Sequence, residues 1–327
     1  MIDQFNRDIN YLRVSVTDRC NLRCVYCLPE FSKDFIDESK LLTIDEYFRL
    51  IRILGNLGIK KVRITGGEPL VRRGIPGLIK SINNLENIEE TAMTTNGILL
   101  EKYLDELAEN GLSSLNISLD ILDEKKYNYI TRGGELEKVV RSIEKAIEYK
   151  IKIKLNSVII DDFNKNDIKS LVNFAVDKNI DIRFIELMPI GCGQNLKGVS
   201  NEEILEIISK DRETAEINSS GTISGPAAYH KIEGTNTRIG FISPLSSCFC
   251  ETCNRIRITS EGKLKQCLYY DSKLDLMKML RTETSDKKLM EEIKNEIYFK
   301  NKQHNFTGSP EDKEKEKEKN TMSVIGG

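Results

Sequence analysis

The stretch "YLRVSVTDRCNLRCVYC", residues 11–27, joins a strand-like run to three closely spaced cysteines. Within this run Leu12 and Val14 fall on one face, and Tyr11 and Arg13 fall on the other. Parallel strands that are covered on both faces are usually continuous apolar runs, which this one is not. The alternation therefore predicts a strand with one face in a core and one polar face.

Five further runs with β-forming character follow, and most are separated by stretches with helical periodicity. The strand-like runs are "IKKVRIT", "TAMTT", "SLNISLD", "IKIKLNSVII" and "IDIRFIEL". Six strand-then-helix units with connections of helix length indicate a parallel α/β sheet, either curled as a partial barrel or open. We predict a partial (βα)6 TIM-type barrel with a C-terminal α+β extension.

Four basic residues fall on the polar face of these strands, namely Arg13, Arg63, Lys154 and Arg183. A solvated antiparallel face would explain them, but helical connections must cover at least one face of such a sheet. A polar barrel lumen fits better, and isolated buried cations are costly. We therefore favour a bound polyanion over a purely structural network of ion pairs.

Composition restricts the class of protein. The 327 residues contain 49 Lys and Arg and 51 Asp and Glu, which gives a net charge of −2. Such a balance provides no global argument for binding nucleic acid or membranes, so an anionic partner needs a local basic cluster. No run of about eighteen apolar residues occurs, and the first residues lack the apolar core of a signal peptide. We expect a cytoplasmic protein without a membrane or nucleic-acid partner.

Six of the eight cysteines form two groups of three. In a reducing compartment, clustered thiols are more often metal ligands than disulfides. The first group, Cys20, Cys24 and Cys27, has the spacing C-x3-C-x2-C and no histidine nearby. Structural zinc usually takes four ligands, whereas three thiolates can hold an iron–sulfur cubane with one iron left open for chemistry.

The spacing C-x3-C-x2-C, with "VYC" at its end, resembles the radical S-adenosylmethionine (SAM) superfamily. "TGGEP", residues 65–69, resembles the glycine-rich SAM-binding motif of that superfamily. Both motifs follow strands, and active sites form at the carboxyl ends of barrel strands. The resemblance implies that the open iron chelates SAM, and that an electron from the cluster splits SAM into methionine and a 5′-deoxyadenosyl radical.

The second group is Cys250, Cys253 and Cys267, spaced C-x2-C-x13-C. A zinc ribbon with Cys248 as fourth ligand competes with a second open cluster, although Cys248 and Cys250 are only one residue apart. We favour the cluster. With "NRIRIT" next to it, and with "RITGGEPL", "TTNG", "RFIELMPIG" and the terminal "IGG", the chain resembles the molybdenum cofactor biosynthesis protein A family, the GTP 3′,8-cyclases, over its whole length.

This resemblance implies a role for individual residues. The two cysteine groups would hold two [4Fe-4S] clusters. The SAM contacts would be Tyr26, Gly67, Ser118 and Met188. The GTP contacts would be Arg13, Arg63, Thr94, Lys154, Arg183, Arg255 and Arg257. The terminal Gly326 and Gly327 would insert into the active site and support catalysis. For Cys192 and Cys248 the resemblance implies no ligand role.

The implied reaction starts with abstraction of the ribose 3′ hydrogen of GTP, followed by attack of the carbon radical on C8 of guanine. Its product is 3′,8-cyclo-7,8-dihydro-GTP, the first committed intermediate toward molybdopterin. The implied partners are GTP, an external electron donor and a downstream enzyme that forms cyclic pyranopterin. The oligomeric state is left open, and a homodimer is compatible with the resemblance.

Three regions are expected: residues 1–190 as the partial barrel with the first cluster, residues 191–308 with the second, and residues 309–327 as a charged flexible tail that ends in Gly-Gly.

Three other hypotheses about the function remain open. A radical SAM peptide-modifying enzyme usually has more auxiliary cysteines than this chain. A zinc-stabilised binding module would use the second cysteine group. A sulfur carrier would use the terminal Gly-Gly, but a charge run precedes it where a ubiquitin-like domain is needed.

Overall fold

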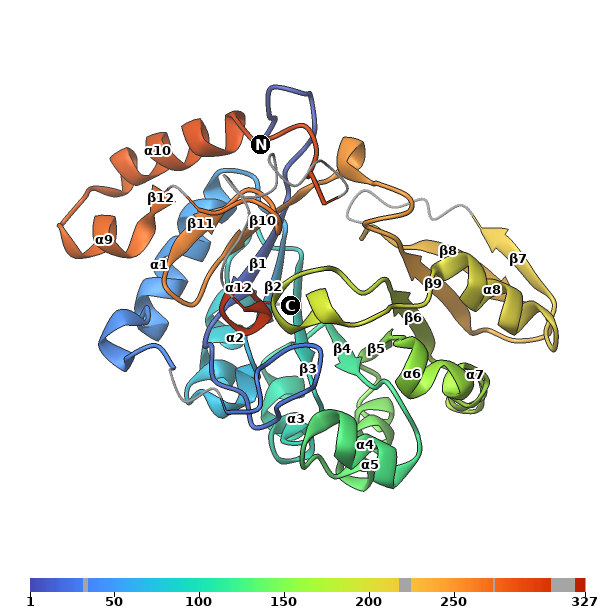
Figure 1. Cartoon of the computed structure of the whole chain (residues 1–327). Helices are drawn as coiled ribbons and strands as arrows, with labels where there is room; N and C mark the ends of the chain where they lie inside the picture. The colour runs from blue at the N-terminus through green and yellow to red at the C-terminus, as the bar shows by residue number, and fades with distance from the viewer. Residues whose placement is uncertain (32–34, 218–224, 273, 307–320, 327) are drawn as a thin grey trace.

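The fold is α/β, with six parallel strands in sequence order at its centre (Figure 1). The computed structural model describes residues 1–31, 35–217, 225–272, 274–306 and 321–326. The central strands are β1 (Tyr11–Ser15), β2 (Lys61–Thr65), β3 (Glu90–Thr95), β4 (Ser114–Ser118), β5 (Lys152–Val158) and β6 (Asp181–Ile185). Each pairs in parallel with the next. The predicted parallel α/β sheet is confirmed.

Helices connect the central strands and cover one face of the sheet. They are α1 (Ile44–Asn56), α2 (Ile75–Asn83), α3 (Leu100–Glu109), α4 (Glu124–Thr131), α5 (Leu136–Glu148), α6 (Asp161–Asn164) and α7 (Ile168–Asp177). Helix α1 begins with a capping box, in which Glu46 N donates to Thr43 Oγ1 and Thr43 N donates to the Glu46 carboxylate. Its residues Tyr47, Leu50 and Leu54 then bury toward the sheet.

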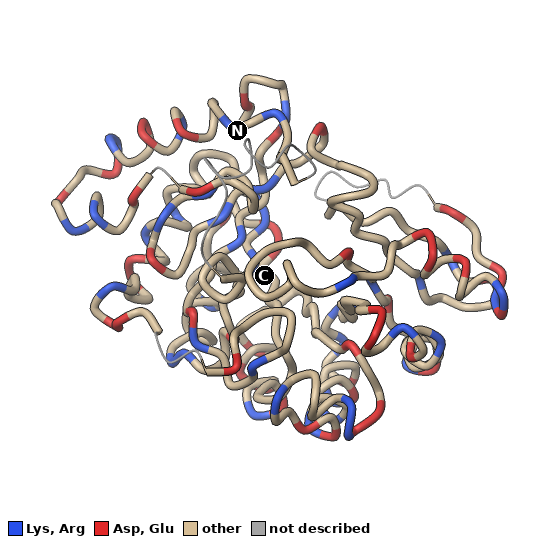
Figure 2. Tube along the Cα trace, viewed as in Figure 1, with Lys and Arg blue, Asp and Glu red and all other residues tan. Residues whose placement is uncertain are grey.

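Short 3-10 helices lie in several loops: η1 (Glu38–Lys40), η2 (Pro69–Val71), η3 (Lys165–Asp167), η4 (Gly191–Asn195) and η5 (Cys250–Thr252). In the described part of the chain, no helix is long and apolar enough to cross a membrane. Basic and acidic residues are interspersed over the outer helices (Figure 2).

The C-terminal region extends the sheet at both edges. β10 (Arg255–Ile258) pairs in parallel with β1, followed by the antiparallel β11 (Lys263–Lys265) and β12 (Leu274–Asp275). At the other edge β9 (Arg238–Ile242) pairs in parallel with β6, followed by the antiparallel β8 (Ala228–Ile232) and β7 (Thr214–Ile217). The remaining helices are α8 (Asn201–Ser209), α9 (Leu276–Arg281) and α10 (Asp286–Tyr298). Because one sheet contains strands from both sides of residue 190, the domain boundary there stays a prediction.

The two faces of the sheet differ as the alternation predicted. Leu12, Val14 and most of their counterparts on the other central strands are buried in the core under the helices. On the opposite face Arg13 lies in register with Arg63 of β2 and with Arg257 of β10. Three arginines thus stand side by side across adjacent strands, an arrangement that repels itself unless negative charge lies near.

The end of the chain folds back onto the barrel. Residues Met322–Ile325 form the short helix α12, which lies against β1 (Figure 1). Ser260 N donates to the carbonyl of Val324 over 3.1 Å, and Arg257 donates to the carbonyl of Gly326. The predicted charge run at 309–320 and the predicted role of Gly327 lie outside the described residues.

Candidate active site

The polar face of the sheet lines a cavity of about 720 Å³. Its wall includes the six predicted cations on five strands, namely Arg13, Arg63, Lys154, Arg183, Arg255 and Arg257, together with Lys61, Lys152 and Arg238. Cys250, Cys253 and Cys267 also line it. The structure thus brings together the predicted basic lumen and the predicted second cysteine group, which are separated by up to about 250 residues of chain.

Several of these cations donate hydrogen bonds to hydroxyl or amide oxygens rather than to carboxylates. Arg63 Nε donates to the hydroxyl of Tyr11 over 2.6 Å, and Lys154 Nζ donates to the hydroxyl of Tyr229 over 3.1 Å. Arg183 donates to Asn156 Oδ1 over 2.7 Å. Such bonds orient the cations but leave their charge without compensation, so the cavity attracts an anion.

The crowding of positive charge is visible in the pKa values. Burial, and next the charge of Arg183, lower the pKa of Lys154 to about 7. Burial and the neighbouring Arg257 hold the pKa of Arg13 well below its usual range. Although burial opposes it, the charges of Arg63, Arg13 and Lys61 lower the pKa of the Tyr11 phenol to about 7. Burial alone disfavours charge of either sign, but the contribution of the neighbouring cations to each shift, and the lowered pKa of Tyr11 above all, favour negative over positive charge in the cavity.

Two ion pairs and one polar atom complete the wall. Lys61 pairs with Glu90 over 2.6 Å, and Arg238 pairs with Asp181 over 2.5 Å. Asn116 lines the cavity, and its Oδ1 is buried without a hydrogen-bond partner in the described structure. A buried acceptor of this kind is costly unless a ligand donates to it. Asn116 lies on the polar face of β4, so the alternation of the strand already indicated that its side chain faces the lumen.

The first cysteine group lies in the loop after β1. Burial raises the pKa of Cys20 to about 11 and that of Cys27 to about 12, and it also raises the pKa of Cys24. As free thiolates these groups would be costly, and metal cations supply the compensating charge. Cys20 Sγ accepts from Leu22 N over 3.4 Å and from Asn96 Nδ2 over 3.7 Å. Three free thiols in one short loop are the donor set of an iron–sulfur cluster, and it is this donor set that fits the group.

Tyr26 anchors the cysteine loop to the central strands. Its hydroxyl donates to Asp120 Oδ2 over 2.7 Å, and the backbone N–H of Val158 donates to Asp120 Oδ1 over 2.8 Å. Burial raises the pKa of Asp120 to about 6. The sequence indicated Tyr26 through the family motif, but it gave no sign that Asp120 holds it in place.

Gly67 lies where two loops approach closely. Its N–H donates to the carbonyl of Thr17 over 2.7 Å, and a Cβ on Gly67 would lie 2.4 Å from the carbonyl oxygen of Arg19. Only glycine fits so near another backbone. The "TGGEP" turn is thereby packed directly against the start of the cysteine loop.

The other predicted contacts are distributed around this centre. Ser118 is the last residue of β4, and Met188 lines the cavity just after β6. A Cβ on Gly193 would meet the carbonyl oxygens of both Met188 and Tyr26, so these two segments lie together. Thr94 is not among the described residues that line the cavity, and its buried hydroxyl has no hydrogen-bond partner in the described structure.

The second cysteine group has a different electrostatic environment. Although burial opposes it, Arg255 and Lys300 lower the pKa of Cys253 to about 6. Arg255 Nη2 lies 3.9 Å from Cys253 Sγ. Thiolates are the form that binds iron, so this site also fits a cluster.

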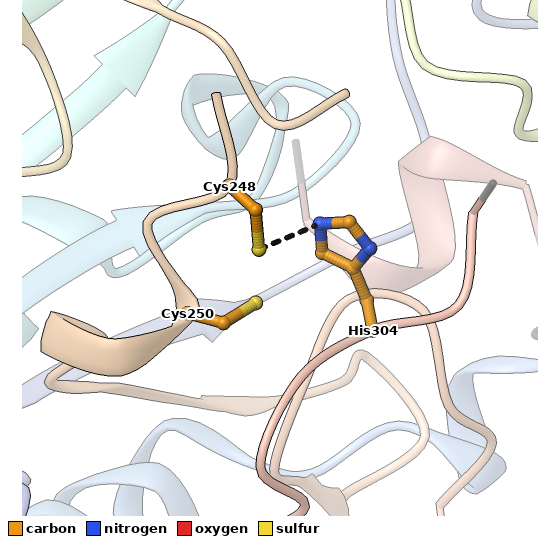
Figure 3. A group of neighbouring side chains, drawn as sticks. All are labelled: Cys248, Cys250 and His304. Carbon is orange, nitrogen blue, oxygen red and sulfur yellow. Dashed lines mark hydrogen bonds between the residues drawn. The ribbon is translucent and has the colours of Figure 1, made fainter. Parts of the chain in front are cut away.

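Two residues that the motifs did not include lie beside this group. Figure 3 shows Cys248 and Cys250 next to the imidazole of His304, with Cys248 Sγ 3.7 Å from His304 Nε2. Burial lowers the pKa of His304. Fifty-six residues separate Cys248 from His304 in the chain, and no sequence pattern connects them.

Comparison with known proteins identifies the family. Residues 14–175 match the Radical SAM superfamily, and residues 180–306 match Molybdenum Cofactor Synthesis C. A GTP 3′,8-cyclase of Clostridium perfringens strain 13 is 52% identical over 327 residues, which is 100% of both chains. The chain belongs to the GTP 3′,8-cyclase family. Another member of this family, from Peptoclostridium acidaminophilum, is 45% identical over 301 residues, 90% of this chain and 91% of that one.

A solved structure supports the fold of this GTP 3′,8-cyclase family member. Streptococcus suis SuiB bound to S-adenosylmethionine has a TM-score of 0.62 and 17% sequence identity. The alignment covers 86% of this chain and 66% of SuiB. At that identity the similarity shows a shared fold, and the predicted partial barrel agrees with it.

Proposed function

We propose that this chain converts GTP into (8S)-3′,8-cyclo-7,8-dihydroguanosine 5′-triphosphate in molybdenum cofactor biosynthesis. One observation carries the proposal: a single cavity joins six cations to a wall of three cysteines, in a chain of the GTP 3′,8-cyclase family. The cations suit a triphosphate, and thiolates with an open iron suit a nucleobase ligand.

The first cysteine group would hold the SAM cluster through Cys20, Cys24 and Cys27. One-electron reductive cleavage of SAM is the chemistry that this cluster would supply when bound. The protein's own share is orientation: Tyr26, fixed by Asp120, holds the loop, and Gly67 lets the "TGGEP" turn approach it. Ser118 and Met188 would complete the SAM contacts.

The second group would hold the other cluster through Cys250, Cys253 and Cys267, which line the cavity. In the same cavity, Arg13, Arg63, Lys154, Arg183, Arg255 and Arg257 would bind the phosphates of GTP. Cys20, Cys24 and Cys27 are not among the described residues that line this cavity. Asn116, with its buried free acceptor, is a further candidate to receive a hydrogen bond from GTP. We keep Thr94 as a weaker GTP contact, because it does not line the cavity among the described residues.

The C-terminal segment would complete the site. Arg257, one of the cavity cations, donates to the carbonyl of Gly326, so the tail contacts a residue that we assign to triphosphate binding. The φ angle of Gly326 is +83°, a conformation that favours glycine. We propose that Gly326 and Gly327 insert into the active site and support catalysis, and that Gly326 positions Arg257 there. The electron donor would be an external protein, and the product would pass to a downstream enzyme that forms cyclic pyranopterin.

The two cysteine groups allow a test by separation of function. The full chain, reconstituted anaerobically with iron and sulfide, is incubated with SAM, GTP and a reductant. Cys24→Ala is expected to abolish 5′-deoxyadenosine formation, whereas Cys253→Ala is expected to retain SAM cleavage without cyclised GTP. If both variants are folded and lose SAM cleavage equally, the proposed division of labour is wrong.

A further inference from the structure

Cys248, Cys250 and His304 are arranged as ligands of a single metal ion. Their ligand atoms all lie within 4.8 Å of one another (Figure 3). Zn–S bonds of about 2.3 Å and Zn–N bonds of about 2.0–2.1 Å place tetrahedral ligand atoms roughly 3.6–3.8 Å apart. The Cys248 Sγ to His304 Nε2 distance of 3.7 Å already meets this geometry. The other pairs need to close by about 1 Å at most, which small rotations of the side chains provide.

The surroundings hold the imidazole at this place. The Phe306 ring packs on the imidazole with a centroid distance of 4.8 Å. Phe306 N also donates to His304 Nδ1 over 3.4 Å, a bond that metal binding at Nε2 would break, because Nδ1 then carries the imidazole proton. Phe306 is itself buried against Tyr269, with their ring centroids 4.9 Å apart. The ring packing thus keeps the imidazole beside the thiols, with Nε2 facing Cys248 Sγ. Cys248 is exposed, so an ion can enter from solvent.

The chemical character of the donors selects the ion. Two thiolates and one imidazole are the ligands that Zn²⁺ and similar borderline-soft divalent ions prefer. On binding, the two thiols release their protons to water, so no oxidant or reductant is needed. Three protein ligands leave the fourth position for a water molecule.

This ligand set overlaps with the proposed cluster ligands at one residue. Cys250 belongs to both sets, whereas Cys253 and Cys267 are not part of the compact group among the described residues. We propose that Cys248, Cys250 and His304 form a mononuclear site for a Zn²⁺-class ion, which competes with the second cluster for Cys250. The ion site does not depend on the proposed function, whereas the competition rests on the second cluster.

Cobalt binding tests the ion site without iron. Metal-free full-length protein carrying Cys24→Ala, which weakens the first cysteine group as a competing site, is titrated with Co²⁺ under anaerobic conditions. We expect the absorption of tetrahedral Co²⁺ with thiolate charge-transfer bands. Cys248→Ala and His304→Ala should each weaken it at least about 100-fold, since loss of an outer-shell partner alone costs roughly 10- to 100-fold. Cys267→Ala is the matched control and should retain the spectrum.

Two results would overturn the ion site: a spectrum lost with Cys267→Ala, or one unchanged with both Cys248→Ala and His304→Ala. Circular dichroism of every variant separates loss of a ligand from loss of fold. Cys248 is exposed, so its replacement removes no core packing.

Zinc preloading tests the competition. Protein with all eight cysteines is loaded with Zn²⁺ and then supplied with iron and sulfide. We expect the zinc-loaded protein with all eight cysteines to bind about four irons, and the zinc-loaded Cys248→Ala variant to bind about eight. Removal of zinc by a chelator should restore about eight irons in the protein with all eight cysteines. Equal iron contents in the two proteins would refute the competition. If neither reaches about eight irons without zinc, the two-cluster proposal fails and the competition with it, while the cobalt titration still decides the ion site.

Discussion

We expect Lys154, a proposed GTP contact, to make GTP binding depend on pH. The side chain lines the cavity, its Nζ donates to the Tyr229 hydroxyl over 3.1 Å, and burial and the nearby Arg183 lower its pKa to about 7. A bound triphosphate would bring negative charge next to Nζ and raise this pKa again. Binding of GTP above pH 7 should therefore take up a proton.

The sign and size of the effect follow from linkage. Well below pH 7, Lys154 is protonated in both the free and the bound protein, so affinity does not change with pH. Above pH 7 the free protein loses the proton that the complex retains, and affinity falls by up to about tenfold per pH unit until the pKa of the complex is reached. From pH 7.5 to 9.0 the expected loss is about twentyfold.

Isothermal titration calorimetry of cluster-loaded protein measures the GTP affinity and the proton uptake on binding. The proton uptake is obtained by repeating the titration in buffers of different ionisation enthalpy. Tyr11→Phe serves as the background, because the Tyr11 phenol, with a pKa of about 7, titrates in the same direction. At pH 7.5 and above, a terminal phosphate with a pKa of about 6 is already ionised. Lys154→Arg should remove the pH dependence and keep tight binding, and Lys154→Met should remove it and bind weakly. If GTP affinity depends on pH equally in the Tyr11→Phe protein and in the same protein carrying Lys154→Arg, Lys154 is not the titrating group and the reasoning is refuted.

Three substitutions test other parts of the site. Gly326→Ala places a Cβ 2.4 Å from Thr65 Oγ1, so it should displace the tail and sharply lower cyclisation, while the iron content stays the same. Tyr26→Phe removes a buried hydrogen bond to Asp120 and should lower the free energy of unfolding by about 1–3 kcal/mol in urea denaturation of metal-free protein. Arg255→Ala should weaken GTP binding about ten- to a hundredfold in calorimetry, with SAM binding unchanged.

Matched controls define what would contradict these three expectations. Gly77→Ala adds a Cβ with nothing within 4 Å, and Tyr129→Phe alters a tyrosine that is 65% exposed. If Gly326→Ala cyclises GTP as well as Gly77→Ala does, the tail has no role in catalysis. If Tyr26→Phe and Tyr129→Phe have the same free energy of unfolding, the Tyr26 hydroxyl does not anchor the cysteine loop. If Arg255→Ala loses SAM binding, Arg255 contacts SAM and its assignment to GTP is wrong.

The period-two pattern of the strands predicted the basic lumen, because neighbouring parallel strands in register present the same face. Arg13 and Arg63 are partners in that register, so the pattern in two separate strands was sufficient to place them together. The same pattern placed Asn116 on the lumen face, but it could not predict that Asn116 Oδ1 has no hydrogen-bond partner in the described structure. Local spacing likewise indicated each cysteine group, since ligands a few residues apart must lie close.

Contacts between distant segments could not be predicted in this way. His304 reaches Cys248 only because Phe306 packs against Tyr269 and orients the segment between them. Tyr229 reaches Lys154 from β8, an antiparallel strand at the edge of the sheet. These approaches depend on how the C-terminal region packs on the barrel, and no periodicity in the sequence records that packing.

The central claim is that one cavity holds GTP so that its ribose 3′ hydrogen passes to the radical derived from SAM. The most direct measurement incubates the anaerobically reconstituted full chain with SAM, a reductant and GTP deuterated at the 3′ position. Mass spectrometry then measures deuterium in 5′-deoxyadenosine. The account predicts one deuterium in the 5′-deoxyadenosine that forms together with cyclised GTP. Cyclised GTP accompanied by 5′-deoxyadenosine without deuterium would contradict it.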